Sequence, residues 1–171
     1  MIFAAERDPR LITIRRGGCL TEADHRLLAW WAADCAEHVL SLFEAAGPDD
    51  GRPRQAVAAA RAWTRGEVAM MRCRAAGGHA NGAARALAGP AREAAHAAGQ
   101  AACVPHVADH ALGAAAYGIR AARAAVPAEE RAAAGRAECA WQREQLPAAI
   151  RDLVLDDQRR RNAHCWGLFD F

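Results

Sequence analysis

Histidine and carboxylate side chains gather in the segment PHVADHALGAAAY, which begins at Pro105 and contains His106, Asp109 and His110. On a helix, residues three and four apart share one face, so these side chains would lie together. Imidazole nitrogens and carboxylate oxygens bind zinc, iron or manganese, and buried groups of the same types also form hydrogen-bonded networks. The cluster predicts one of these two arrangements, and the spacing alone favours the network.

Two other segments offer ligands that would complete a metal site. Asp34 and His38 are four residues apart, and Glu67 follows Trp63 by one helical turn. If the three segments meet in a helical bundle, they would hold one divalent transition metal. The full candidate ligand set is His106, His110, Asp109, Asp34, His38 and Glu67.

Short motifs that mark common enzyme classes do not occur in the sequence. It has no glycine-rich phosphate loop, no HExxH zinc motif and no GxSxG nucleophile motif. Cys35 and His38 are three residues apart, but no third residue can be named to orient such a nucleophilic pair. The sequence leaves enzymatic activity open, favours its absence, and predicts no cofactor apart from the alternative metal ion.

Four charged residues surround an expected turn, namely Asp49, Asp50, Arg52 and Arg54. One interpretation is a solvated turn whose side chains cap the next helix. The other is a recognition edge, since the arginine guanidinium makes paired contacts with a partner. Both interpretations stay open.

Trp30 and Trp31 are neighbours in an expected helix, so their side chains point about 100° apart. One of them is a candidate for an exposed binding anchor, and the alternative is that neighbouring elements cover both. Together with Trp63 and Trp141 they would also suit an apolar cleft for a small molecule.

Alanine, the strongest helix former, makes up roughly a quarter of the 171 residues. Apolar spacing predicts helices over residues 22–46, 53–78, 80–88 and 90–124, with two more opening at Pro127 and Pro147. Residues 1–20 are expected to form an extended lead-in, and the aromatic tail 164–171 to fold back onto the body. We expect one all-α domain over residues 1–171, a compact bundle or an antiparallel array of helical hairpins with five to six helices.

Glycine and proline mark the expected irregularities. Gly77 and Gly78 are interpreted as the end of a helix. Pro105 lies inside the expected helix 90–124, where its ring removes a backbone donor and clashes with the preceding turn, which predicts a kink or a break. A distorted helix beside the densest polar cluster is where we first look for a functional site.

Charge and cysteine content limit the partners. Twenty-two arginines and 20 acidic residues are interspersed, and the formal net charge is +2. This pattern is not typical of nucleic-acid-binding proteins or of strongly acidic inhibitors. Six cysteines occur without a CxxC pair, and no apolar run is long enough for a signal peptide or a membrane span. We expect a cytoplasmic protein with reduced cysteines and neither nucleic-acid nor membrane partners.

Four stretches of the chain resemble the immunity-protein-5-like family, a bacterial family associated with polymorphic toxin systems. They are WAADCAEHVLSLFE (31–44), RPRQAVAAARAW (52–63), HVADHALGAAAYGIRAA (106–122) and WQREQLP (141–147). The resemblance spans most of the chain and implies a small helical cytosolic protein that binds and neutralises a toxin. It implies no catalytic residues.

The leading hypothesis is a non-catalytic immunity or self-protection protein whose partner is a cognate protein toxin or a small toxic molecule. The alternatives are a helical metalloprotein that uses the ligands above, and a protein that confers resistance by holding an antibiotic. A homodimer stays open, because alanine-rich faces pack equally well between chains. The predicted binding residues are Arg52, Arg54, Asp49, Asp50, Trp30 and Trp31.

Overall fold

Eight α-helices and five short 3-10 helices account for most of residues 7–170, the part of the chain that this computed structural model describes. The helices are α1 (Glu22–His38), α2 (Leu40–Glu44), α3 (Arg52–Thr64), α4 (Met70–Ala83), α5 (Gly89–Cys103), α6 (His110–Ala124), α7 (Arg131–Glu144) and α8 (Ala148–Arg161). Within these residues no β-strand forms, apart from one isolated bridge between Thr13 and Leu20. The all-α fold class is confirmed, but the expected five to six helices were too few. Residues 1–6 of the expected lead-in and Phe171 of the expected tail lie outside the described residues.

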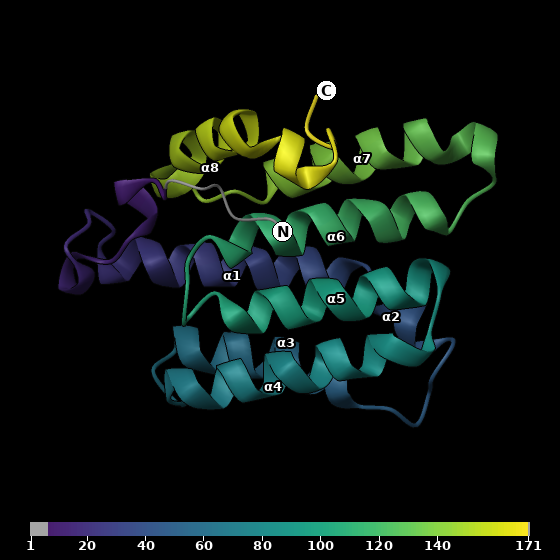
Figure 1. Ribbon diagram of the computed structural model, residues 1–171, viewed down its shortest axis with the longest axis horizontal. Helices are drawn as coiled ribbons and strands as arrows, with labels where there is room; N and C mark the ends of the chain where they lie inside the picture. Colours follow the sequence, from purple (N-terminus) through teal and green to yellow (C-terminus); the bar gives the residue numbers. More distant parts are fainter. Residues whose placement is uncertain (1–6, 171) are drawn as a thin grey trace.

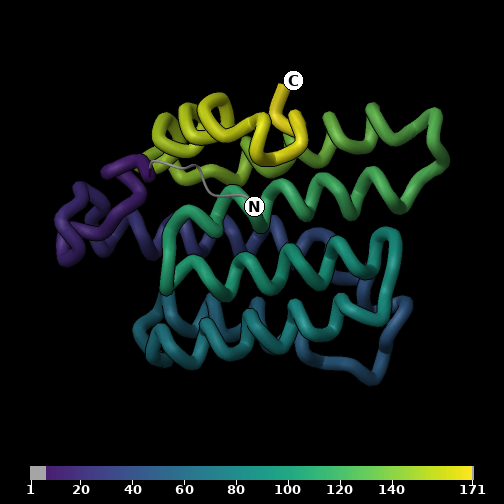
Figure 2. Tube along the Cα trace, in the orientation of Figure 1, coloured from purple at the N-terminus to yellow at the C-terminus, as the bar shows by residue number. Residues whose placement is uncertain are grey.

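The helices run back and forth along the long axis of the molecule, so consecutive long helices are antiparallel (Figure 1 and Figure 2). α5 is central and contacts α1, α2, α3, α4 and α6. On one side of it α3 packs against α4, and on the other side α6 packs against α7. α8 contacts α1 and α6, which completes the bundle above them in Figure 1.

α5 can occupy the centre because its buried residues are small. They are Ala91, Ala94, Ala95, Ala97, Ala98, Gly99, Ala101 and Ala102. Small side chains allow helices to approach closely. The approach is tightest against α4, where a Cβ added to Gly77 would lie 2.8 Å from the carbonyl oxygen of Gly99.

This close approach corrects the interpretation of Gly77 and Gly78 as a helix end. Both residues lie inside α4, which continues to Ala83. The interruption falls earlier, at Gly66, which adopts φ +78° in the loop between α3 and α4. Glycine adopts a positive φ without the steric cost that a side chain brings, so Gly66 ends the helix that the sequence extended to residue 78.

The helix expected over residues 22–46 is divided at Val39 into α1 and α2. After this bend Leu40 and Phe43 are buried, and α2 contacts α5. The apolar spacing continues across the bend, so periodicity alone did not reveal it.

The single helix expected over residues 90–124 is two helices. Pro105 lies in the turn at residues 104–109, where the chain reverses, and α5 and α6 pack as an antiparallel hairpin (Figure 2). The sequence predicted a kink or a break at Pro105, and the structure has a break. Proline cannot donate a backbone hydrogen bond, which disfavours a continuous helix at this position.

The carboxy-terminal elements follow the expectation closely. Pro127 and Pro147 precede the last two long helices, α7 and α8. Phe169 in the tail is buried, while Trp166 is 47% exposed and stacks with Arg120, whose guanidinium carbon lies 4.2 Å from the indole centroid. The described part of the tail therefore does fold back onto the body.

The N-terminal loop, residues 9–20, is folded rather than extended. The backbone N–H of Leu20 donates to the carbonyl of Ile12 at 2.9 Å, and that of Ile14 donates to the carbonyl of Leu20 at 3.1 Å. Gly17 makes the turn possible with φ +84°. The buried side chains of Leu11 and Leu20 attach the loop to the bundle, at the left end in Figure 1.

A helix that crosses a bilayer needs about 20 predominantly apolar residues. The first and longest helix, α1, has 17 residues. Within residues 7–170, no helix reaches the length and apolar character that spanning a membrane requires.

Candidate functional site

A cleft of about 510 Å³ lies where the N-terminal loop meets the helices, and we call it the N-terminal cleft. Its walls come from the N-terminal loop, the start of α1, the last turn of α3, the start of α4 and the turn between α5 and α6. Pro105 and His106 both line it. The polar segment beside the helix break therefore borders a cavity.

The floor of the N-terminal cleft is apolar and its charged groups are mostly cationic. Leu11, Leu20, Trp63, Val107 and Ala108 provide apolar lining. The lining also contains four arginines and a single acidic residue, namely Arg7, Arg15, Arg16, Arg26 and Glu22.

Two histidines also line the cleft, and both are held in environments that disfavour their charged form. The ring Nε2 of His25 donates to the carbonyl of Val104 at 2.7 Å, and burial lowers the pKa of His25. His106 has a buried Nδ1 atom with no hydrogen-bond partner among the described residues. Burial, and then the nearby Arg74 and Arg16, lower the pKa of His106.

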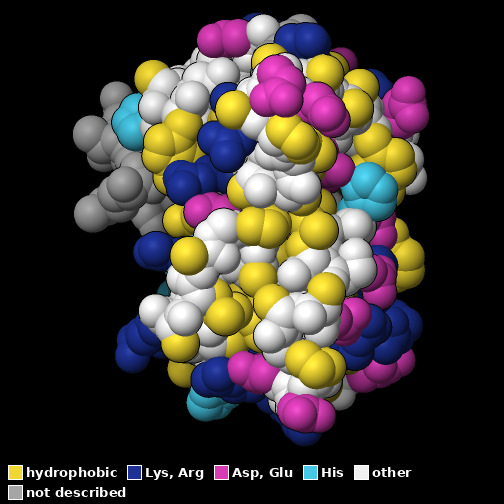
Figure 3. Space-filling model, turned by 90° about the vertical axis from the view of Figure 1, so that its right-hand side faces the viewer, with side chains coloured by type: hydrophobic (Ala, Val, Ile, Leu, Met, Phe, Trp, Pro, Cys, Tyr) yellow, Lys and Arg dark blue, Asp and Glu magenta, His cyan; other side chains and the backbone are white. Residues whose placement is uncertain are grey.

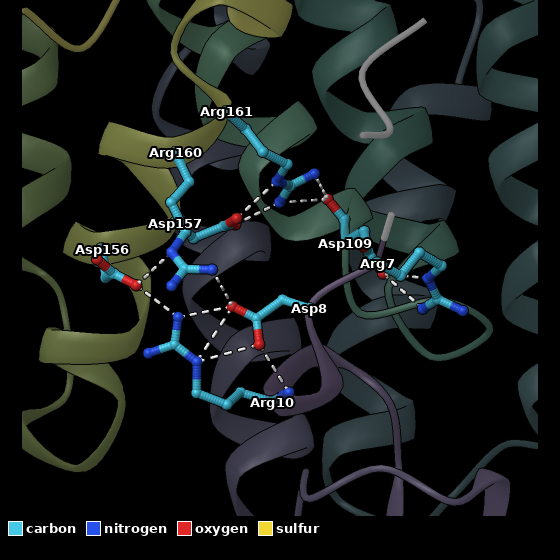
Figure 4. Close-up of polar contacts among 8 residues, drawn as sticks. All are labelled: Arg7, Asp8, Arg10, Asp109, Asp156, Asp157, Arg160 and Arg161. Atoms are coloured by element: carbon cyan, nitrogen blue, oxygen red, sulfur yellow. Dashed lines mark hydrogen bonds and ion pairs between the residues drawn. The ribbon is translucent and has the colours of Figure 1, made fainter. Parts of the chain in front are cut away.

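Ion pairs fasten the start of the N-terminal loop to α8 (Figure 4). Arg10 Nη2 lies 2.5 Å from Asp156 Oδ2 and 2.6 Å from Asp8 Oδ2. The Arg10 guanidinium lowers the pKa of the Asp8 carboxyl and so favours its charged form. Arg160 adds a contact to Asp156 at 3.0 Å. These contacts fix the loop that forms the outer wall of the cleft.

A second set of contacts fastens the turn between α5 and α6 (Figure 4). Arg7 Nη2 lies 2.6 Å from Asp109 Oδ2, and Arg161 Nη1 donates to the Asp109 carbonyl at 3.2 Å. Arg161 also pairs with Asp157, and both side chains are buried. Burial raises the pKa of Asp157, and the hydrogen bond from Arg161 opposes this shift. The eight residues of Figure 4 therefore form two sets of contacts, which we together call the ion-pair network. The first set joins the N-terminal loop to α8, and the second joins Arg7 to the α5–α6 turn and that turn to α8.

The helix face that was expected to carry His106, Asp109 and His110 does not exist. His106 lies in the turn, Asp109 precedes α6 and His110 is its first residue. The ring Nδ1 of His110 donates to Gln100 Oε1 at 2.7 Å. Because the chain reverses here, the four-residue spacing does not place these side chains on one face.

The remaining candidate ligands make separate contacts. Asp34 pairs with Arg61 at 2.8 Å, and Glu67 pairs with Arg65 at 2.7 Å in the loop after α3. No group of three or more His, Cys, Asp or Glu side chains in residues 7–170 is arranged to hold a metal ion. The structure therefore does not bring the predicted ligand set together.

A second hollow, of about 250 Å³, lies between α1, α3 and α7. There the His38 ring stacks on Trp141, with centroids 3.6 Å apart, and its Nδ1 donates to the buried Glu138 carboxylate at 2.8 Å. Sequence reasoning selected His38 but missed Glu138. The signal that could have identified Glu138 is its place beside Cys139, on the inward face of α7.

The adjacent tryptophans differ in exposure, which is one of the two alternatives that the sequence left open. Trp31 is 0% exposed, and its indole N–H donates to the Gln142 carbonyl at 2.7 Å. Trp30 is 42% exposed, and the Arg61 guanidinium lies 5.0 Å from its ring centroid. A role for Trp30 as a binding anchor stays a prediction.

The turn before α3 is held by local ion pairs. Asp50 accepts a hydrogen bond from the backbone N–H of Arg52 and pairs with its guanidinium at 2.6 Å. Arg54 pairs with Glu44 at 2.6 Å, while Asp49 is exposed. This is the geometry of a capped turn, and recognition by these four residues stays a prediction.

All six cysteines are free thiols. Burial raises the pKa of Cys35 well above its usual range and that of Cys165 to about 11. A thiolate is therefore disfavoured at Cys35, and its expected neighbour His38 points its Nδ1 at Glu138 instead.

The segment from residue 18 to residue 149 matches the family model described as Imm-5 like putative immunity protein. The chain belongs to this family. The Imm-5 like segment contains helices α1 to α7 and the first residues of α8. No curated protein and no solved structure shows significant similarity to the chain.

Part of the N-terminal cleft lies outside the Imm-5 like segment. Residues 11–16 of the N-terminal loop, which include Arg15 and Arg16, line the cleft and precede this segment. From the sequence, these arginines were expected only to belong to the extended lead-in of residues 1–20. Their place beside a cavity depends on contacts with α8 and the α5–α6 turn, which local sequence does not encode.

Proposed function

We propose that this protein is an immunity protein that neutralises a cognate toxin by binding it in a stoichiometric complex, without catalysis. Membership in the Imm-5 like family supports the immunity role. The proposal places the protein in the cytoplasm of the producing bacterium, where its free thiols stay reduced.

The observation that carries the proposal is the shape and support of the N-terminal cleft. It is a concave surface of about 510 Å³ with an apolar floor and a polar rim, the combination found in binding sites. Its outer wall, the N-terminal loop, is fixed to α8 by the ion pair of Arg10 with Asp156, and Arg7, just before the loop, pairs with Asp109 in the α5–α6 turn. A fixed wall favours tight binding, because little conformational freedom is lost when the partner docks.

Titration of the toxin encoded beside this gene tests the proposal. We expect purified protein to abolish toxin activity at an equimolar ratio, and the mixture to elute as one complex in size-exclusion chromatography. A toxin that is inactivated progressively by a small fraction of an equivalent would instead indicate catalysis. The absence of both complex and protection would overturn the proposal.

A second candidate function is the capture of a small toxic molecule. The volume of the N-terminal cleft falls within the roughly 300–1,000 Å³ range of ligand pockets. Of the four tryptophans expected to line one cleft, only Trp63 lines this one, because Trp31 is buried and Trp141 lines the second hollow. Quenching of tryptophan fluorescence by candidate antibiotics, lost in Trp63→Phe, would favour this function over toxin binding.

A further inference from the structure

The charges that line the N-terminal cleft are unbalanced although the whole chain is nearly neutral. The formal net charge of the chain is +2, yet among the described residues that line the cleft Glu22 is the only acidic one, against four arginines. A cavity wall dominated by one sign of charge attracts groups of the opposite sign.

Two of the four arginines are already neutralised. Arg7 pairs with Asp109 at 2.6 Å, and Arg26 pairs with Glu22 at 2.6 Å while also donating to the Thr64 carbonyl at 2.9 Å. These contacts fix both side chains, so neither is the main free cation of the cleft.

Arg15 and Arg16 are the two cations that remain. Both are exposed, and neither forms an ion pair with any residue in the range 7–170. The one hydrogen bond of Arg16 is a long one, from Nη1 to the His106 carbonyl at 3.5 Å. The guanidinium groups are therefore available to a partner, and arginine binds carboxylates in paired geometry.

Apolar surface lies directly beside these cations. Ile14, the residue before Arg15, is 63% exposed and lines the cleft. Trp63 and Val107 continue the apolar lining inward. A partner that fills the cleft must therefore present a carboxylate and an apolar side chain close together.

The opposite end of the molecule differs from the cleft. Figure 3 shows that hydrophobic side chains and uncharged atoms fill the middle of that end, with charged groups toward its edges. The loops there are rich in alanine, glycine and proline, as in residues 45–48 and 86–90. Exposed arginines without an ion pair among residues 7–170 also occur elsewhere, as on α7, but Arg15 and Arg16 are the ones that line the cleft.

We propose that the N-terminal cleft binds an acidic segment of the toxin polypeptide, with carboxylates held by Arg15 and Arg16 and an adjacent apolar side chain on the cleft floor. This inference rests on the proposed function and names the partner chemistry. His106 also lines the cleft, on the wall that the α5–α6 turn provides.

Fluorescence anisotropy with synthetic peptides tests the chemistry of the cleft. The probes are a fluorescein-labelled peptide alternating aspartate with leucine, the same peptide with asparagine in place of aspartate, and a single-stranded oligonucleotide of equal charge. We expect the acidic peptide to bind about tenfold more tightly than the asparagine peptide, and its binding to weaken with added salt. Equal binding of the two peptides, or preference for the oligonucleotide, would overturn the inference.

A charge-matched pair of variants locates the binding. R15E/R16E reverses the two free cations. R131E/R136E makes the same charge change on two exposed arginines of α7 that form no ion pair within residues 7–170, and α7 begins at the other end of the molecule. We expect about a tenfold loss of acidic-peptide affinity in the first variant and about a twofold change or less in the second. Equal losses in both variants would show a net-charge effect and would overturn the inference.

The two proposals fail in distinguishable ways. If the neighbouring toxin forms an equimolar complex with the protein and R15E/R16E binds it as tightly as the parent protein, the cleft inference is wrong and the immunity function stands. If the toxin forms no complex with the parent protein, the proposed function is wrong.

Discussion

Two neighbouring tryptophans on α1, Trp30 and Trp31, contribute very differently to the stability of the fold. Trp31 is fully buried and donates its indole N–H to the Gln142 carbonyl, whereas Trp30 is partly exposed above Arg61. Trp31→Phe removes the donor and leaves a small cavity, so we expect the free energy of unfolding to fall by about 2 kcal/mol. Trp30→Phe is the matched control, with a loss of less than about 1 kcal/mol. Urea unfolding measures both, and equal losses would contradict the burial pattern.

His110 gives the stability of the protein a pH dependence. Burial lowers the pKa of His110 to about 4, from an ordinary value of about 6.5 in the unfolded chain. Between these values the unfolded state binds a proton that the folded state does not, so the free energy of unfolding falls as the pH falls. We expect this residue to contribute a loss of about 2 kcal/mol between about pH 7 and pH 5.

The control for this prediction is His110→Gln, whose amide can still donate to Gln100. Its unfolding free energy should depend less steeply on pH than that of the parent protein. Some slope will remain, because burial also lowers the pKa of His25 and of His96. Identical slopes in the two proteins would show that His110 is not responsible.

At the scale of helices, the contact between α4 and α5 depends on glycine. A Cβ on Gly77 would lie 2.8 Å from both Cys103 Sγ and the Gly99 carbonyl, whereas a Cβ on Gly78 would meet nothing within 4 Å. Gly77→Ala should therefore destabilise the protein by about 1–3 kcal/mol. Gly78→Ala should stabilise it by about 0.5–1 kcal/mol, because alanine favours the helix. Thermal unfolding of the two variants tests this difference in sign, and shifts in the same direction would contradict it.

The same glycines show what the sequence can and cannot predict about the elements. Alanine content and apolar spacing correctly predicted an all-α fold, and Pro127 and Pro147 correctly marked two helix starts. Gly77 was misread because a glycine that permits close packing looks, in one sequence, like one that ends a helix. Pro105 correctly marked an irregularity in the sequence. Periodicity did not show that the helix breaks there rather than kinks, or that Gly66 rather than Gly77 ends a helix.

The candidate site was predictable only in part for the same reason. The sequence pointed to the segment after Pro105, and His106 does line the N-terminal cleft. The other wall of the cleft contains Arg15 and Arg16, about ninety residues away in the chain. Periodicity describes neighbouring turns of one helix and cannot show that such distant residues meet. The predicted ligands do not come together, because the chain reverses between Pro105 and His110, and because Asp34 and Glu67 pair with Arg61 and Arg65.

On the scale of the whole molecule, the ion-pair network joins the two ends of the chain. Asp156 on α8 contacts Arg10 at 2.5 Å and Arg160 at 3.0 Å, so Asp156→Ala should release the N-terminal loop. We expect several-fold faster amide hydrogen exchange in residues 9–20 and a change of less than about 1 kcal/mol in global stability, since these pairs are partly exposed.

Asp152→Ala is the matched control for the network, because Asp152 is an exposed carboxylate on the same helix without an ion pair among the described residues. Exchange in residues 9–20 should be unchanged in this variant. If Asp156→Ala also leaves exchange unchanged, the network does not hold the wall of the cleft.

The most direct test of the account is a hydrogen-exchange footprint of the protein alone and mixed with the toxin encoded beside its gene. We expect an equimolar complex in which exchange slows in residues 11–20 and 104–108, the two walls of the N-terminal cleft, and stays unchanged at the start of α7. A mixture without a complex, or protection confined to surfaces away from the cleft, would contradict it.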